Sequence, residues 1–348
     1  MARSRVAIAS LGGTITMTST SADGQGARPS LTAEQLIAAV PVLAEVADLA
    51  ATTLNTLPGA SLAFPDVIGG LNWARTEVDR GADGAVLIQG TDTIEETAYL
   101  LDLFWDRSAP LIVTGAMRSP QTPGADGPAN LNAGVRVASA DASRDRGVLV
   151  VMNDEIHAAR WVRKTRASGA GAFESPSFGP VGQLDEDQAV YGGVAAERRP
   201  LSLPEPFVAP RVALLETYLG DDGELLEAVA DRGFQGVVLA GYGVGHVSST
   251  VAAIVGKVAR AIPVVFASRT GAGSTHRNTY GFDGSESDLI ARGAIPAGWL
   301  DARKARVLLA CLLAAGADHG NIRDEFGFRS GPAQPSAVSL AGAKTAMK

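Results

Sequence analysis

Short apolar runs alternate with longer helical stretches through the first half of the chain, and this alternation constrains the fold more than any other feature. The runs are apolar on both faces, which is typical of parallel strands covered by helices on both sides of a sheet. The pattern predicts an α/β domain with a parallel, flavodoxin-like sheet. We expect its strands at Val6–Ser10, Val46–Leu54, Gly84–Gln89, Pro110–Thr114 and Gly147–Met152.

The helices between these strands begin at recognisable signals. Thr32 and Gln35 have the spacing of a capping box, and Asp66 is placed to cap a helix that runs to about Arg80. We expect two further helices, at Thr93–Arg107 and Asn130–Ala140.

A proline-rich stretch, Glu197–Pro210, interrupts the alternation with four prolines in eleven residues. Such spacing is incompatible with a regular helix or central strand and suits a linker. A second alternation follows and predicts a smaller C-terminal α/β domain. Its expected strands are Arg211–Glu216, Gly236–Ala240 and Ile262–Ala267, and its expected helices are Glu224–Arg232, Ser249–Arg260, Ala302–Ala314 and Ile322–Phe326.

The length of 348 residues also fits two domains. We expect an N-terminal catalytic domain over residues 1–200, a linker over 201–210, a C-terminal domain over 211–330 and a flexible tail over 331–348.

The composition excludes several classes of protein. The net charge of -7 argues against a nucleic-acid partner, because such partners are usually met by a basic face. The single cysteine, Cys311, permits neither an intrachain disulfide nor a cysteine-rich zinc site. No apolar run reaches the ~18 residues of a membrane span, and the apolar stretch near the N-terminus is shorter than a secretory signal. We therefore expect a cytoplasmic protein that does not enter a membrane.

Glycine and threonine follow two of the predicted strands. Gly12-Gly13-Thr14 comes after the first strand, and Gly90-Thr91-Asp92 comes after the third. The carboxyl ends of parallel strands meet at one edge of the sheet, where ligands bind. Glycine allows a ligand to approach the backbone closely, so both threonine hydroxyls are candidates for a reactive site.

A hydroxyl is a weak nucleophile unless a base accepts its proton. The chain has 25 arginines but only five lysines, and only Lys164 directly follows a strand-end segment. Arg160, Arg163 and Arg166 lie around it in the sequence, a cationic setting that favours a neutral amine. His157 is close by, but its position favours a structural role.

Each of these residues also has a structural interpretation. Thr14 can belong to an ordinary turn or to a phosphate loop, although the Lys of a Walker motif is missing. Asp92 can serve as a helix N-cap, and Lys164 can be a solvated surface side chain.

Four segments together resemble the bacterial-type L-asparaginase family. ASLGGTI at Ala9–Ile15 is similar to the family's T-G-G-T-I motif, and GAVLIQGTDTIEET at Gly84–Thr97 is similar to its G-T-D-T-[IL]-E-E-T motif. Pro110–Ala133 resembles the strand and G-A-M-R stretch that follow, and Val150–Thr165 resembles the segment with the family's lysine. The resemblance covers about residues 5–330.

The resemblance implies a larger N-terminal and a smaller C-terminal α/β domain, and it implies a role for each matching residue. Thr14 would be the nucleophile. Thr91 would be a second catalytic hydroxyl, paired with Lys164 in a proton relay. Asp92 would bind the substrate's α-ammonium and Ser61 its α-carboxylate. Two glycines would complete the substrate-binding segments, Gly13 and Gly90.

The implied reaction is hydrolysis of L-asparagine to L-aspartate and ammonia through a β-aspartyl ester, with no metal or cofactor. The implied assembly is a homo-oligomer, a dimer or tetramer, with sites at subunit interfaces completed by an acid of the neighbouring subunit. Glu286 is our candidate for that acid.

Three departures from the family pattern bear on substrate choice. Thr16–Pro29 contains no tyrosine, although the family's mobile loop carries one there. Leu62 follows Ser61 where a polar residue is common, and Gly241–His246 lacks the usual asparagine.

Alternative functions therefore stay open. They are a glutaminase-asparaginase, an amidase on another amino-acid amide, and a non-catalytic amino-acid sensor on the same scaffold. A nucleotide-binding Rossmann enzyme is disfavoured because the glycines lack G-x-G-x-x-G spacing.

Overall fold

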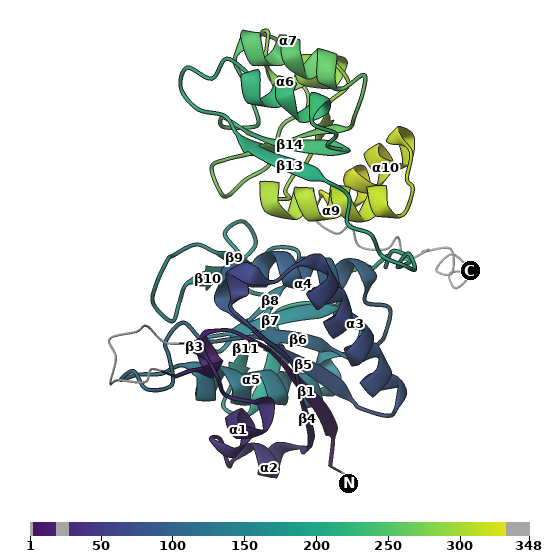
Figure 1. The fold of residues 1–348 in the computed structure, drawn as a ribbon. Coiled ribbons are helices and arrows are strands. Elements are labelled where there is room, and N and C mark those ends of the chain that lie inside the picture. The colour runs from purple at the N-terminus through teal and green to yellow at the C-terminus, as the bar shows by residue number, and fades with distance from the viewer. Residues whose placement is uncertain (1–2, 19–27, 332–348) are drawn as a thin grey trace, which may run out of the picture.

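Two α/β domains make up the computed structural model, which describes residues 3–18 and 28–331 (Figure 1). The N-terminal domain contains an eight-stranded sheet in the order β12-β11-β8-β7-β6-β5-β1-β4. The strands of this sheet are β1 Arg5–Gly12, β4 Asp48–Leu57, β5 Gly84–Ile88, β6 Leu111–Thr114, β7 Val148–Met152, β8 Glu155–Ala158, β11 Gly182–Asp185 and β12 Gln188–Tyr191.

Five neighbouring strands, in the order β4-β1-β5-β6-β7, are parallel. Numbered along the chain they give the order 2-1-3-4-5, which is the flavodoxin-like order. The prediction of a parallel sheet in a two-domain α/β chain is confirmed. The antiparallel strands β8, β11 and β12, which extend this sheet, were not predicted.

Alternate residues of the parallel strands pack against helices on opposite faces. On one face, Leu87 and Val113 join the cores of α3 and α4. On the other, Val86 and Ile112 pack with α1 and α5. The helices of this domain are α1 Ala33–Ala38, α2 Leu43–Val46, α3 Phe64–Asp79, α4 Ile94–Phe104 and α5 Gly127–Ser139, with short 3-10 turns η1 Thr14–Thr16, η2 Gly59–Ser61, η3 Thr91–Thr93 and η4 Asp141–Ser143.

The two predicted helix starts have different outcomes. The capping box is confirmed, because Thr32 Oγ1 accepts from the Gln35 amide and Gln35 Oε1 accepts from the Thr32 amide. Asp66, in contrast, is not the N-cap of α3. The helix begins two residues earlier, and Asp66 reaches back to accept the amide N–H of Ala63 at 2.9 Å.

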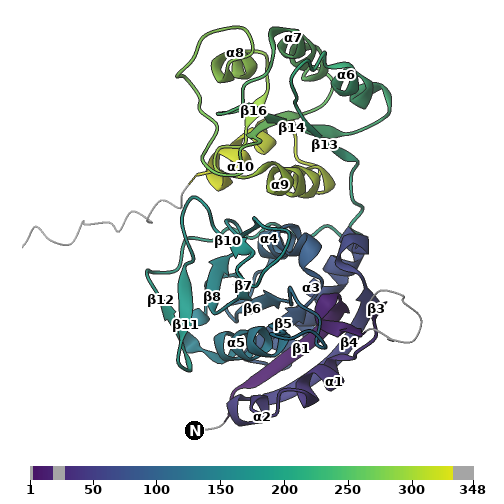
Figure 2. The ribbon, with the colours of Figure 1, turned by 90° about the vertical axis from the view of Figure 1, so that its left-hand side faces the viewer.

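The C-terminal domain has a parallel sheet in the order β13-β14-β15-β16. Its α9 faces α4 of the N-terminal domain, as two perpendicular views show (Figures 1 and 2). One apolar cluster runs through this junction and includes Leu101 and Leu308. The elements of the domain are β13 Val212–Glu216, β14 Gly236–Gly241, β15 Val264–Ser268, β16 Ile295–Pro296, α6 Glu224–Asp231, α7 Ser249–Val258, α8 Glu286–Ala291, α9 Ala302–Ala314 and α10 His319–Arg329.

Two small antiparallel ribbons flank the carboxyl edge of the large sheet. One pairs β2 Met17–Thr18 with β3 Arg28–Pro29, and the other pairs β9 Arg163–Lys164 with β10 Phe173–Glu174.

Among the described residues, no helix combines the length and apolar character needed to cross a membrane.

His157 on β8 is fully buried in the sheet. Its Nδ1 lies 3.1 Å from Ser175 Oγ. Its Nε2 lies 3.3 Å from Glu155 Oε2 but finds no hydrogen-bond partner among the described residues. Burial lowers the pKa of His157 to about 4, because the imidazolium loses its hydration.

The wild type is therefore expected to lose stability as the pH falls from about 6.5 towards about 4. In that range the unfolded chain binds a proton at this residue and the folded chain does not. Replacing His157 by Asn should remove up to about 3 kcal/mol of this pH dependence. Urea unfolding of the wild type and the variant between about pH 6.5 and about pH 4 measures this difference. If the free energies of unfolding of the two proteins changed in parallel with pH, the lowered pKa of His157 would be contradicted.

Candidate active site

Three glycines bring the ends of three parallel strands into contact. Gly13 follows β1, Gly90 follows β5 and Gly59 follows β4. A Cβ on Gly13 would lie 2.0 Å from the Gly90 nitrogen, and a Cβ on Gly90 would lie 2.6 Å from the Gly59 nitrogen. No side chain fits at these crossings, so only glycine allows the three segments to meet.

Each of these glycines introduces a short 3-10 turn that carries a predicted site residue. Thr14 opens η1, Thr91 opens η3, and Ser61 ends η2. Gly13 has φ of 92°, which a residue with a side chain rarely adopts. Thr16 stabilises the first turn by donating from Oγ1 to the Gly13 carbonyl at 2.7 Å.

Lys164 joins this group from a distant part of the chain. Its Nζ donates to Thr91 Oγ1 at 2.9 Å and lies 3.4 Å from Asp92 Oδ1. Thr91 is buried, whereas more than half of the Asp92 side chain is exposed. The structure therefore brings a hydroxyl, an amine and an accessible carboxylate together at the carboxyl edge of the sheet.

The backbone of Lys164 also has defined partners. It lies in the β9–β10 ribbon opposite Phe173, and its amide donates to Glu95 Oε2 at 2.9 Å. Glu95 also pairs with Arg303 at 3.3 Å, so α4 connects the lysine strand to α9 of the second domain.

The arginines near Lys164 in the sequence point to other partners. Arg160 donates to the carbonyls of Phe328 and Arg329, Arg163 to that of Gly271, and Arg166 pairs with Glu174. The expected cationic setting around the amine is therefore not formed by contacts of these arginines. Among the described residues, the groups that contact Nζ are a hydroxyl and a carboxylate.

Glu286 has contacts within its own chain. Its Oε1 accepts the amide N–H groups of Thr279 and Tyr280, and its Oε2 lies 2.9 Å from His246 Nε2. The side chain is fully buried. The expectation that Glu286 reaches a neighbouring subunit does not fit these contacts, because the side chain is buried and its two oxygens meet two segments of the same chain.

The segment without a tyrosine, Thr16–Pro29, falls largely on residues 19–27, which lie outside the described residues. In the part of the chain that the structure covers, no cluster of three or more His, Cys, Asp or Glu side chains is arranged to hold a metal ion.

The sequence analysis missed three positioning residues. They are Gly59, which contacts Gly90; Thr93, whose Oγ1 donates to the Gly59 carbonyl at 3.1 Å; and Glu95, which holds Lys164. Thr93 and Glu95 belong to the TDTIEET run, so their place in that motif was a usable signal.

Comparison with known proteins accounts for both domains. A family model for the asparaginase N-terminal domain matches residues 5–195, and a model for the glutaminase/asparaginase C-terminal domain matches residues 211–326. The chain belongs to the asparaginase family.

Asparaginase relatives cover most of the chain. It is 34% identical over 328 residues to L-asparaginase 2-3 of Saccharomyces cerevisiae, covering 90% of this chain and 87% of the relative. It is 32% identical over 298 residues to L-asparaginase 2 of Escherichia coli, covering 84% of each. The crystal structure of a probable cytoplasmic L-asparaginase from Campylobacter jejuni superposes with a TM-score of 0.82 at 31% identity, covering 93% of this chain and 99% of that one.

Proposed function

We propose that this chain hydrolyses L-asparagine to L-aspartate and ammonia. The observation that carries the proposal is the 2.9 Å contact between Lys164 Nζ and Thr91 Oγ1, beside the glycine crossing that holds Thr14. A hydroxyl paired with an amine is a means of moving a proton. The relatives named above, which are L-asparaginases, support the choice of substrate.

In the proposed mechanism, Thr14 Oγ attacks the side-chain carbonyl carbon of asparagine. The hydroxyl proton leaves through the Thr91–Lys164 pair and is delivered to the departing amine. Ammonia departs and leaves a β-aspartyl ester on Thr14. Water, deprotonated by the same pair, then hydrolyses the ester and regenerates the hydroxyl. Every step is carried by side chains of this protein.

We assign the groups remote from the reacting amide to substrate binding. Asp92 is the proposed partner of the α-ammonium, since its carboxylate is accessible and already pairs with the ammonium group of Lys164. Ser61, exposed at the end of η2, is the proposed partner of the α-carboxylate. Because Gly13 and Gly90 have no side chains, the substrate can approach the backbone closely at these positions. Binding at these remote groups would orient the amide for attack.

We also propose a homo-oligomer, by analogy with the family, in which the site lies at a subunit interface. For the location we propose the cytoplasm, as in the name of the Campylobacter protein. A relative from Haemophilus influenzae, in contrast, is named a probable periplasmic L-asparaginase.

Initial rates with L-asparagine, L-glutamine and D-asparagine test the substrate. We expect L-asparagine to be the preferred substrate. A higher kcat/KM for glutamine would identify a glutaminase-asparaginase instead.

The absence of a tyrosine from Thr16–Pro29 favours one alternative of another class, a sensor that binds an amino acid without turnover. Calorimetry that detects tight aspartate binding by a protein that releases no ammonia would favour the sensor over the enzyme.

A further inference from the structure

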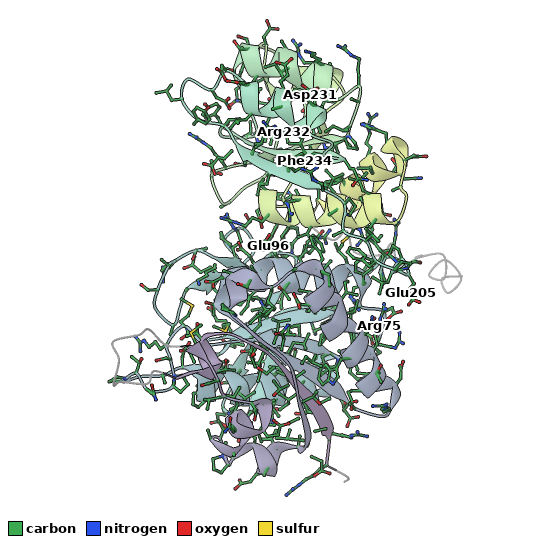
Figure 3. The ribbon with its side chains drawn as sticks, viewed as in Figure 1. Arg75, Glu96, Glu205, Asp231, Arg232 and Phe234 are labelled. Carbon is green, nitrogen blue, oxygen red and sulfur yellow. The ribbon has the colours of Figure 1, made fainter. Side chains whose placement is uncertain are left out.

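A cavity of about 280 Å³ lies at the junction of the two domains, beside the candidate active site. Its walls come from the start of α3, the outer face of α4 and one turn of α9. Glu96, which lines it, lies on α4 where this helix faces the C-terminal domain (Figure 3). Neither Thr14, Thr91 nor Lys164 lines this cavity, so it is separate from the site described above.

Two opposite charges line the cavity without forming an ion pair. Glu96 stands on α4 and Arg306 on α9, and they attract each other across the space. Within residues 3–18 and 28–331, the Glu96 carboxylate accepts no hydrogen bond. Arg306 uses Nε to reach the Val212 carbonyl at 3.0 Å, and its two terminal nitrogens bind no acceptor in the same residues.

The surroundings of Glu96 disfavour its charged form. Burial, together with the charge of Glu95, raises the pKa of the Glu96 carboxyl despite the attraction of Arg306. A cation bound against this carboxylate would offset the lost hydration. An anion bound against the terminal nitrogens of Arg306 would gain charge-assisted hydrogen bonds.

The rest of the wall is mainly apolar. Val67 on α3, Leu100 on α4 and Val307 on α9 face the same space as the two charges. The volume lies just below the ~300 Å³ at which ordinary ligand sites begin, so the occupant must be small. A molecule that matches these features carries one positive group, one negative group and a compact apolar body.

We propose that this cavity binds an α-amino acid with an apolar side chain, with its ammonium group against Glu96 and its carboxylate against Arg306. The ligand's apolar side chain fills the space between Val67, Leu100 and Val307. Leu62 and Thr93, which directly follow Ser61 and Asp92, also line the cavity. The bound amino acid would therefore contact both segments proposed to hold the substrate.

Titration calorimetry of the full chain with L-leucine tests the proposal. Two analogues serve as probes of the charges: 4-methylpentanoate lacks the amine, and 3-methylbutylamine lacks the carboxylate. We expect leucine to bind and each analogue to bind at least about tenfold more weakly, the loss typical of one charged hydrogen-bond partner. Equal binding of leucine and either analogue, or no heat from leucine with folded protein, would overturn the proposal.

Four variants locate the binding. Glu96→Gln and Arg306→Met should each weaken leucine binding at least about tenfold. Asp92→Ala, at the proposed substrate site, and Lys257→Met, whose lysine pairs with Glu227 away from the cavity, should leave it unchanged. Loss of binding in Asp92→Ala but not in Glu96→Gln would place leucine in the substrate site and overturn the proposal. Circular dichroism checks that each variant is folded, and no readout depends on asparagine turnover.

Discussion

Replacing Thr14 by alanine is expected to reduce kcat for asparagine hydrolysis at least about 1,000-fold, because it removes the hydroxyl on which the proposed acyl ester forms. Binding of aspartate should persist, since the proposed contacts to its ammonium and carboxylate groups come from Asp92 and Ser61. Ammonia release measures the first effect and calorimetry the second.

Thr14→Ser is the matched control for this experiment, because it restores a hydroxyl on the same backbone. We expect it to recover a measurable part of the activity. If Thr14→Ala released ammonia as fast as the wild type, Thr14 would not be the nucleophile.

Removing either member of the Thr91–Lys164 pair should reduce kcat by a factor of about 100 to 10,000. The pair works as one proton-transferring unit, joined by the 2.9 Å contact. The Thr91→Val/Lys164→Met double variant should therefore be little slower than either single variant, because residues that act as a unit give strongly non-additive effects. Steady-state kinetics on the three variants measure the coupling.

Lys257→Met is a suitable control, since it removes a lysine that pairs with Glu227 on the surface of the C-terminal domain. It should leave kcat unchanged. Losses that multiply in the Thr91→Val/Lys164→Met protein would show that the two side chains act independently and would contradict the relay.

The parallel core was predictable because each of its strands is apolar on both faces. Val86 and Leu87 are adjacent in β5 and pack against opposite helix layers, which is the arrangement that a two-faced apolar run predicts. The strands β11 and β12 gave no such signal. Their residues alternate between exposed and half-buried positions, and Gln183 and Asp185 are polar.

The candidate site was predictable by residue type but not by contact. A threonine after a strand, and a lysine that follows a strand-end segment, indicated the chemistry. Lys164 and Thr91 are 73 residues apart, however, and the β9–β10 ribbon brings the lysine to the threonine. The partners of Arg163 and Glu286 lie in loops of the C-terminal domain, and their placement depends on tertiary packing that short-range sequence patterns do not encode.

The most direct test of the account is simultaneous measurement of aspartate and ammonia released from L-asparagine by the purified wild-type chain. We predict saturable turnover with equal amounts of the two products at every time point. A folded protein that binds asparagine and releases neither product would contradict the proposed function.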